Sequence, residues 1–500
     1  MILWVDAVCI DQLNVDERNV QVQAMTRIYN QAYEVAVWLG SEAEESSSAL
    51  NFLREINTLN IMPSRDQKLR ETFKDPGRLS QLQAVVCLFE RDYWNRLWVV
   101  QEVHSAKKIK VHCGSTSLPW TYFTTSSSLF RLHLNNLATL MQEKVSATGY
   151  TWATILSNHG PARLWDMRED SPTKLLPYLI FHRSKACADA RDKVFGLLGA
   201  LSLHERSQII VDYSMSIREV YTNVVEYVLR TTRRLDVICA SIHFPWHQSP
   251  SALPTWVPDW SQTSAQPPIS YLFPRKFTAS CAKDVNYSYS HNRRRLQITA
   301  IPIDEIHHCG THLSPPRSLN TILIVMFQWR LKLLEFVGRG PNSISAHEAF
   351  CRTLCFDRDQ HKISPRELLD WTYHTFANLL QERYHHLELD EQLKFYAKIR
   401  TPDNAHFQNL IFEDYFADAM TGRRFLLTSN GLFGLGTGAA RSSDIVCVPL
   451  GCSTPVILRK VGDGYRYVGD VYIDGYMYGK AIEEMERGVI HRQPRSFLLI

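Results

Sequence analysis

Near the start of the chain lies the run Leu3-Trp-Val-Asp-Ala-Val-Cys-Ile-Asp-Gln12. A second run of mixed hydrophobic and polar residues is Tyr93-Trp-Asn-Arg-Leu-Trp-Val-Val-Gln-Glu-Val103. Both runs place polar groups among hydrophobic residues: Asp6, Asp11 and Gln12 in the first, Gln101 and Glu102 in the second. Burying an unpaired carboxylate or amide costs several kcal/mol. These side chains are therefore paired, exposed to solvent or functional.

The first 114 residues are expected to form a small α/β layer. Residues 2–10 predict a buried strand, because they are rich in β-branched and aromatic residues with little alternation. Asn14 is a candidate N-cap of a following helix, with Glu17 placed for the capping box. Residues 34–39 and 108–113 predict two further strands. A parallel, doubly wound arrangement follows from this order.

The carboxyl ends of such strands are the usual place for a ligand. Residues 9–12 occupy that end of the first predicted strand. A helix over 81–106, broken near Arg91 and Asp92, is expected to bring Glu102 towards the same rim. Residues 60–80 are polar and contain Pro and Gly, so a loop is predicted there.

Residues 118–240 show mainly helical periodicity. Within them, Asp189-Ala-Arg-Asp-Lys193 has two interpretations: a salt-bridged helix start, which is favoured, or a ligand-binding segment. Residues 253–261 combine tryptophan with proline, so they predict an ordered connector, with an aromatic ligand platform as the alternative.

The pattern of hydrophobic and turn residues changes twice in the C-terminal part. Residues 270–306 mix short β-like runs with basic loops, and residues 319–333 and 365–397 predict helices. After residue 419, β-rich runs separated by Gly-containing turns predict a small antiparallel barrel or sandwich. Residues 431–438 are rich in Gly but lack the Lys and the following helix of a phosphate loop, so a turn is predicted. The expected domains are therefore 1–114 (α/β), 115–262 (mainly helical), 263–419 (mixed, mainly helical) and 420–500 (β-rich).

The composition is that of an intracellular globular protein. Of 500 residues, 45% are hydrophobic and 21% charged, and the net charge is +4, which excludes wholesale disorder and gives little support to nucleic-acid binding. Eleven cysteines without a Cys-x-x-Cys pair indicate a reducing compartment and free, mostly buried thiols. Neither a secretory signal nor a membrane-spanning run is evident. We expect a cytoplasmic protein without a membrane partner.

Two Cys/His groups raise the question of a metal: the segment 307–312 around Cys309, and Cys351 with Cys355 and His361. Neither supplies a second ligand pair at the spacing that closes a four-ligand site. No metal site is predicted, and no cofactor is required.

The two opening runs, with Glu17-Arg18, Met25 to Tyr29 and Val35-Ala-Val-Trp-Leu-Gly40, resemble in order and spacing the fungal heterokaryon-incompatibility (HET) domain. Residues 190–199, 211–214, 253–261 and 431–479 look like the extended architecture of long proteins of this family. Two departures stand out. Nothing precedes Met1 where the family has a further strand ending in a Ser-Tyr-x-Trp-Gly type motif, and Asp11 stands where Asn is frequent. We therefore expect a HET domain that is N-terminally truncated, with its first strand missing.

The resemblance implies a signalling or interaction protein in fungal non-self recognition that leads to regulated cell death. Its partners would be other incompatibility or signalling proteins, or a second copy of the chain. HET domains are also similar to Toll/interleukin-receptor (TIR) domains, some of which hydrolyse NAD with a Glu in a Trp-x-x-x-Glu pattern, and residues 98–102 match that pattern.

The rival hypothesis is therefore a TIR-like NAD glycohydrolase, and a third is an inactive paralogue. Cleavage of the nicotinamide-ribose bond develops positive charge that a carboxylate can stabilise. Glu102 is the candidate catalytic residue, although a salt-bridged helix carboxylate is its more ordinary role. The candidate ligand-binding residues are Asp6, Asp11, Gln12, Arg18 and Trp98.

Overall fold

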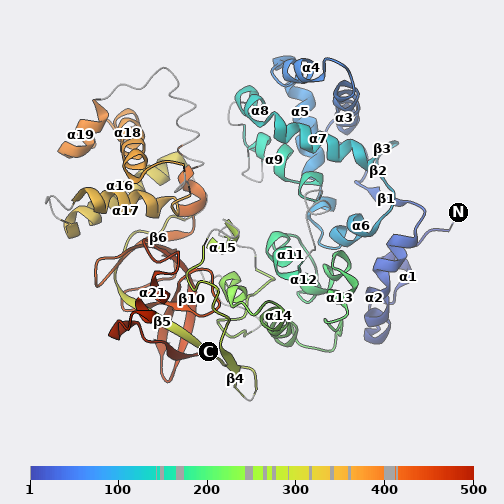
Figure 1. Cartoon of the computed structure of the whole chain (residues 1–500). Coiled ribbons are helices and arrows are strands. Elements are labelled where there is room, and N and C mark those ends of the chain that lie inside the picture. Colours follow the sequence, from blue (N-terminus) through green and yellow to red (C-terminus); the bar gives the residue numbers. More distant parts are fainter. Residues whose placement is uncertain are drawn as a thin grey trace. The chain divides into compact units, whose positions relative to one another are not determined.

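The computed structural model describes residues 2–141, 144–146, 151–164, 174–241, 252–262, 267–272, 277–290, 292–314, 318–337, 343–358, 362–398, 412 and 415–500. The chain divides into two compact units (Figure 1). The first comprises Met1–Val220 with Trp260–Gln262, and the second comprises Tyr221–Asp259 with Thr263–Ile500. The four-domain division remains a prediction.

The first predicted strand is wrong. Residues 2–5 are irregular, and Asp6–Cys9 forms a single helical turn, α1, in which the Asp6 carboxylate accepts the backbone N–H of Ala7 at 2.8 Å. A strand is stable only when a neighbour satisfies its backbone groups. None of the described strands pairs with this run, and its side chains are mostly exposed, Ile2 completely so.

The helix that follows was predicted correctly. α2 (Val15–Gln31) begins after Asn14, whose side chain accepts the N–H of Glu17 at 3.1 Å. The Glu17 carboxylate reaches back to the N–H of Asp11, at 3.2 Å, rather than to Asn14. Val22 and Met25 are the buried positions of this helix.

The sheet of the first unit has three strands in the order β1-β2-β3: Val35–Trp38, Ile109–Cys113 and Thr116–Pro119. β1 and β2 are parallel, with Val37 opposite Val111, and both strands were predicted. β2 and β3 are antiparallel and joined by a tight turn at Gly114, so the sheet is mixed rather than purely parallel. The alternating burial of β1 and β2 shows that each keeps one face in the core.

Helices connect β1 to β2. They are α3 (Ser46–Asn60), α4 (Arg65–Thr72), the 3-10 turn η1 (Pro76–Arg78), α5 (Leu79–Phe89), η2 (Asp92–Asn95) and α6 (Val99–Ser105). The loop predicted over 60–80 is therefore partly wrong, because α4 docks through the buried Leu69. The predicted break near Arg91 is confirmed between α5 and η2.

The rest of this unit is helical, as predicted. It contains α7 (Trp120–Leu132), α8 (Leu134–Met141), α9 (Trp152–Asn158), α11 (Leu175–Phe181), α12 (Asp192–Phe195), η3 (Leu198–Ala200) and α13 (Leu203–Arg206). The core between α5 and α7 is aromatic: Trp94 lies 5.9 Å from Trp120 and 6.2 Å from Phe123, measured between ring centroids. Tilted ring contacts of this kind stabilise the core in addition to the effect of the area that they bury.

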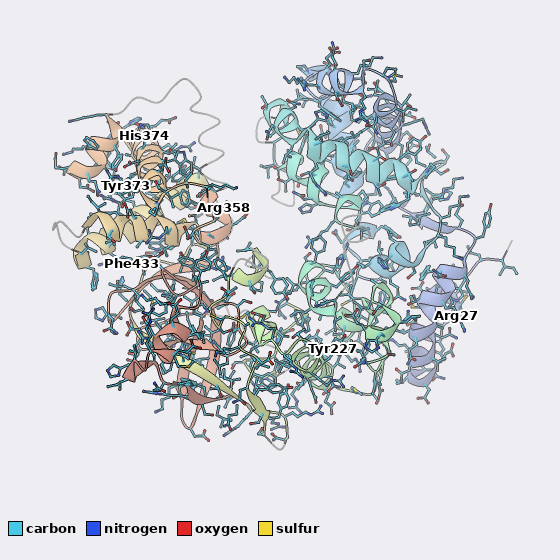
Figure 2. All side chains as sticks on the ribbon, in the orientation of Figure 1. Arg27, Tyr227, Arg358, Tyr373, His374 and Phe433 are labelled. Carbon is cyan, nitrogen blue, oxygen red and sulfur yellow. The ribbon has the colours of Figure 1, made fainter. Side chains whose placement is uncertain are left out.

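The second unit opens with helices and closes with a sheet. Its helices are α14 (Ile217–Thr232), which starts in the first unit, η4 (Asp236–Ala240), α15 (Ile269–Leu272), α16 (Leu319–Val337), α17 (Ser343–Leu354), α18 (Pro365–Arg383) and α19 (Glu391–Ala397). α16, α17 and α18 pack together around Tyr373, which is fully buried (Figure 2). Trp256, in the aromatic connector, is also fully buried.

The sheet of this unit has eight strands and is antiparallel apart from the β10–β11 pair. The strands are β4 (Tyr287–Tyr289), β5 (Leu296–Cys309), β6 (Arg423–Thr428), β7 (Phe433–Thr437), β8 (Ile445–Pro449), β9 (Val456–Val461), β10 (Gly464–Ile473) and β11 (Arg495–Leu499). The pairings run from β5 through β6, β7, β10, β9 and β8 back to β5, so the sheet closes on itself. Two short helices, α21 (Lys480–Glu486) and η5 (Ile490–Arg492), precede β11.

The predicted β-rich region is confirmed, with one error. The Gly-rich segment 431–438 contains β7 instead of only a turn. A Cβ at Gly434 would lie 2.6 Å from Ile473, and one at Gly436 would lie 2.7 Å from Leu426. Glycine is therefore required by close packing in the sheet. Among the helices that the structure describes, none is long and apolar enough to cross a membrane.

Candidate functional site

Glu102 lies in the first turn of α6, and the hydroxyl of Tyr93 donates a hydrogen bond to its Oε2 at 3.0 Å. Burial raises the pKa of the Glu102 carboxyl. The hydrogen bond from Tyr93 and the charge of Arg96 oppose this rise, whereas the charge of Asp6 adds to it. Glu102 therefore has an environment unlike that of a surface salt bridge, and the charge of Asp6 is one of those that act on it. Its role as a site residue stays a prediction.

Aromatic side chains enclose this carboxyl. Burial, followed by the charge of Glu102, raises the pKa of both Tyr29 and Tyr93. The Trp4 ring meets the Tyr29 ring edge-on at 5.6 Å. A neutral tyrosine donates to a carboxylate without carrying charge itself, so this arrangement holds a titratable acid in apolar surroundings.

A cleft of about 780 Å³ lies at the carboxyl end of β1. Trp38 and Gly40 line it from the strand end, Glu90 and Arg96 from the α5–α6 region, and Trp152 from α9. The cleft is therefore placed as expected for an α/β sheet, but at the end of residues 35–38 rather than at residues 9–12.

Tyr93 links the cleft to Glu102. Its side chain lines the cleft while its hydroxyl holds the carboxyl, and Glu102 itself is not among the lining residues. Arg91 shapes the opposite wall: its guanidinium donates to the carbonyls of Leu39 and Ser41, both at 2.9 Å. These bonds fix the path of the chain where it leaves β1.

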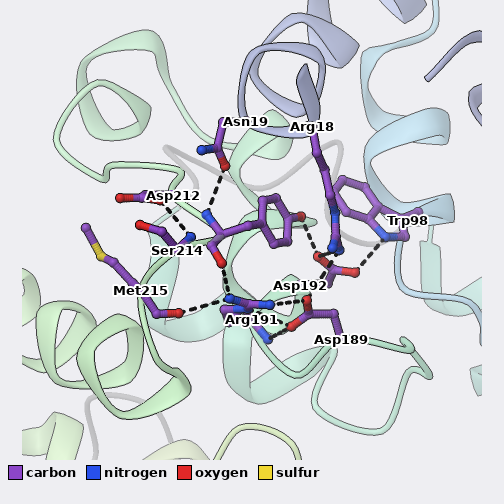
Figure 3. Close-up of polar contacts among 10 residues, drawn as sticks. Arg18, Asn19, Trp98, Asp189, Arg191, Asp192, Asp212, Ser214 and Met215 are labelled. Carbon is purple, nitrogen blue, oxygen red and sulfur yellow. Dashed lines mark hydrogen bonds and ion pairs between the residues drawn. The ribbon is translucent and has the colours of Figure 1, made fainter. Parts of the chain in front are cut away.

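Arg18 and Trp98 meet in a second polar cluster (Figure 3). Trp98 Nε1 donates to Asp192 Oδ2 at 3.4 Å, and Arg18 Nη2 lies 3.5 Å from Asp192 Oδ1. The Tyr213 hydroxyl donates to Asp192 Oδ1 at 2.5 Å, and the Arg18 guanidinium lies 3.6 Å from the centre of the Tyr213 ring. This cluster ties α2 and α6 to α12.

The cluster is internally satisfied. Arg191 pairs with Asp189 at 2.8 Å and donates to the carbonyls of Tyr213 and Met215. Asp189 also lies 3.4 Å from Arg18 Nη2. Burial raises the pKa of Asp192, whereas the Tyr213 hydrogen bond lowers it. The ion pairs agree with the favoured prediction of a salt-bridged helix start.

The remaining predicted residues, Asp11 and Gln12, are exposed. Asp11 Oδ1 accepts the N–H of Leu13 at 3.0 Å, a local contact just before the start of α2. The predicted rim at residues 9–12 does not form, because the strand that would have carried it is absent from the described part of the chain.

Sequence reasoning missed Tyr93, Arg96 and Trp38 as site residues, and Asp192 as the partner of Trp98. Trp38 had a signal in the sequence: it stands at the carboxyl end of a predicted strand, the usual place for a ligand in an α/β sheet. Asp192 had none, because it lies far from Trp98 in sequence. Of the residues weighed for a metal, Cys351 is buried in α17, Cys355 is buried in the turn directly after it, and His361 lies outside the described residues.

Comparisons with known proteins fit both ends of the chain. Residues 1–102 match the family model described as heterokaryon incompatibility protein (HET), and residues 357–491 match the Het-6 beta-barrel domain. The N-terminal α/β part and the closed sheet are therefore each similar to a domain of heterokaryon incompatibility proteins.

The similarity to one curated relative extends along nearly the whole chain. Heterokaryon incompatibility protein 6, OR allele, of Neurospora crassa is 23% identical over an alignment 572 residues long. The alignment covers 97% of this chain and 82% of the relative. No solved structure matches the chain.

Proposed function

We propose that this chain acts in fungal heterokaryon incompatibility, the recognition of non-self when hyphae fuse. The observation that carries the proposal is the length of the similarity: it spans nearly the whole chain, including the HET match and the barrel match. A signalling role that ends in regulated cell death, with another incompatibility protein or a second copy as partner, belongs to the same proposal.

Fusion assays test it. Strains of a filamentous fungus that express the chain are paired with tester strains, and dye uptake is counted in fused cells. We expect death in some pairings and none in unfused cells. Arg96→Ala, at an exposed cleft residue, should reduce death, whereas Lys107→Ala, at an exposed residue that does not line the cleft, should not. Normal viability in every pairing would contradict the proposal.

The second candidate is hydrolysis of NAD by a TIR-like site. The observation that favours it is a partly buried carboxyl with a raised pKa, hydrogen-bonded to a tyrosine that lines a cleft large enough for a nucleotide. The reactive form would be the Glu102 carboxylate, because it must stabilise positive charge on the ribose. Since the pKa of Glu102 is raised, activity should increase with pH as the carboxyl loses its proton.

Nicotinamide release measures this activity directly. Wild type should release nicotinamide, and Glu102→Gln should be slower by about 100-fold, the usual effect of losing one electrostatic stabiliser. Glu45→Gln, at an exposed carboxylate, is the matched control. No release by a folded wild-type chain would exclude NAD hydrolysis and leave the signalling role standing.

A further inference from the structure

A compact group of metal-ligand side chains lies in the second unit, away from the cleft. η4 (Asp236–Ala240) follows α14 and contacts the turn between β8 and β9, where the N–H of Leu235 donates to the carbonyl of Gly451 at 2.8 Å. Gly451 has a φ of +82°, and a Cβ there would lie 2.7 Å from the backbone of Val285. Glycine is therefore required at residue 451 by its left-handed backbone and by the close approach of Val285.

Three donors converge at this contact. Asp236 and Cys239 are three residues apart in a 3-10 helix, a spacing that places both side chains on one face. Cys452 comes from the opposing turn, directly after Gly451. One carboxylate oxygen and both sulfur atoms all lie within 4.8 Å of one another. Among the residues that the structure describes, no other His, Cys, Asp or Glu group of this size is so compact.

The distance between the sulfur atoms fits a shared cation. Cys239 Sγ and Cys452 Sγ are 3.5 Å apart. In a tetrahedral zinc site with Zn–S bonds of about 2.3 Å, two sulfur ligands lie about 3.8 Å apart. A disulfide requires about 2.05 Å. The observed separation is therefore close to a tetrahedral edge, and the third donor, Asp236, has no role in a disulfide.

The surroundings resemble the outer shell of a metal site. Asp236 Oδ1 accepts the N–H of Ser453 at 2.7 Å, and Arg234 Nε lies 3.3 Å from Asp236 Oδ2. The Thr454 hydroxyl lies 3.8 Å from Cys239 Sγ, within reach as a further oxygen donor. Such second-shell contacts orient ligands and tune their affinity. Arg234 also offsets the one negative charge that two thiolates, a carboxylate and a divalent cation leave.

We propose that Asp236, Cys239 and Cys452 bind one divalent cation with affinity for sulfur, and that zinc is the best match to this donor set. The ion would fasten η4 to the β8–β9 turn and so join the start of the second unit to its closed sheet. Both thiols must lose their protons on binding, so metal affinity should increase with pH.

Titration of the reduced, chelator-treated full chain with Co²⁺ tests the site. We expect one equivalent of Co²⁺ to give the thiolate charge-transfer and tetrahedral d–d bands, and Zn²⁺ to displace it. Cys239→Ala and Cys452→Ala should each weaken binding by at least about 100-fold. Cys355→Ala removes an equally buried thiol, in the turn directly after α17, and should leave binding unchanged.

A second measurement needs no variant. At a urea concentration that opens the metal-free chain enough to expose its buried thiols, Zn²⁺ should slow the alkylation of Cys239 and Cys452, while the exposed Cys9 and Cys281 react at the same rate with and without metal. The proposal is overturned if the folded wild type gives no cobalt bands, or if zinc protects neither thiol. It is also overturned if the two residues are recovered as a disulfide-linked peptide from a chain that binds no metal under reducing conditions.

Discussion

The cluster of Arg18, Trp98, Asp192 and Tyr213 should behave as one energetic unit. A hydrogen bond to a charged acceptor contributes about 1.5 to 3 kcal/mol, so Tyr213→Phe should cost about 2 kcal/mol of unfolding free energy. Asp192→Asn removes the charge that Tyr213, Trp98 and Arg18 all face, and should cost a similar amount. Tyr213→Phe removes the 2.5 Å bond, and Asp192→Asn leaves that bond with only a neutral acceptor, so the double variant should cost at least about 1 kcal/mol less than the sum.

Urea unfolding with hydrogen exchange as the readout measures this coupling. Peptides from α2 and from residues 189–216 report the first unit without interference from the second. Tyr33→Phe is the control, because its ring is 87% exposed and the change should stay within about 0.5 kcal/mol. Additive losses in the double variant would refute the view that Asp192 joins these elements as a shared acceptor.

Three further outcomes are expected. Gly199→Ala places a Cβ 2.4 Å from the buried Gln101 side chain, so it should destabilise the first unit by about 1 to 3 kcal/mol in thermal or urea unfolding. Burial, with the charge of Arg163 adding, lowers the pKa of Lys185 from 10.5 to about 7, so unfolding free energy should fall as pH drops from 10.5 to 7. Between pH 9.5 and 7.5, Lys185→Met should abolish about 3 kcal/mol of that fall in paired urea titrations. Ser364→Ala breaks the capping box of α18 and should cost about 1 kcal/mol, measured as faster exchange in that helix.

Local signals were sufficient for much of the fold. The cap at Asn14 depends on a contact three residues away, so the sequence shows it directly. The strand predicted over residues 2–10 depends on a partner elsewhere, and hydrophobic character alone cannot supply one. The Gly-rich β7 was mistaken for a turn because Ile473 and Leu426, whose packing excludes a Cβ, are distant in sequence.

For the candidate site, too, local sequence patterns predicted some residues, whereas contacts between distant residues determined the rest. The Trp-x-x-x-Glu pattern indicated Glu102 as a candidate. In the structure this carboxyl has a raised pKa and is hydrogen-bonded to Tyr93, which lines the cleft. The position of the cleft depends on how β1 ends and on Trp152 in α9, which periodicity cannot reveal. Likewise, Cys239 and Cys452 are separated by more than 200 residues, so counting cysteine spacings could not pair them.

The eight-stranded sheet takes two of its strands, β4 and β5, from much earlier in the chain than the others. β5 ends at Cys309 and its neighbour β6 begins at Arg423, with α16 to α19 between them. At a synthesis rate of about 5 to 20 residues per second, the ribosome needs about 6 to 23 seconds to make the intervening segment. During that time β5, a long strand rich in Ile, lacks its later partners β6, β8 and β11. We therefore expect chaperones to bind it. A fragment cut at residue 357, where the barrel match begins, would lack this strand entirely and should misfold.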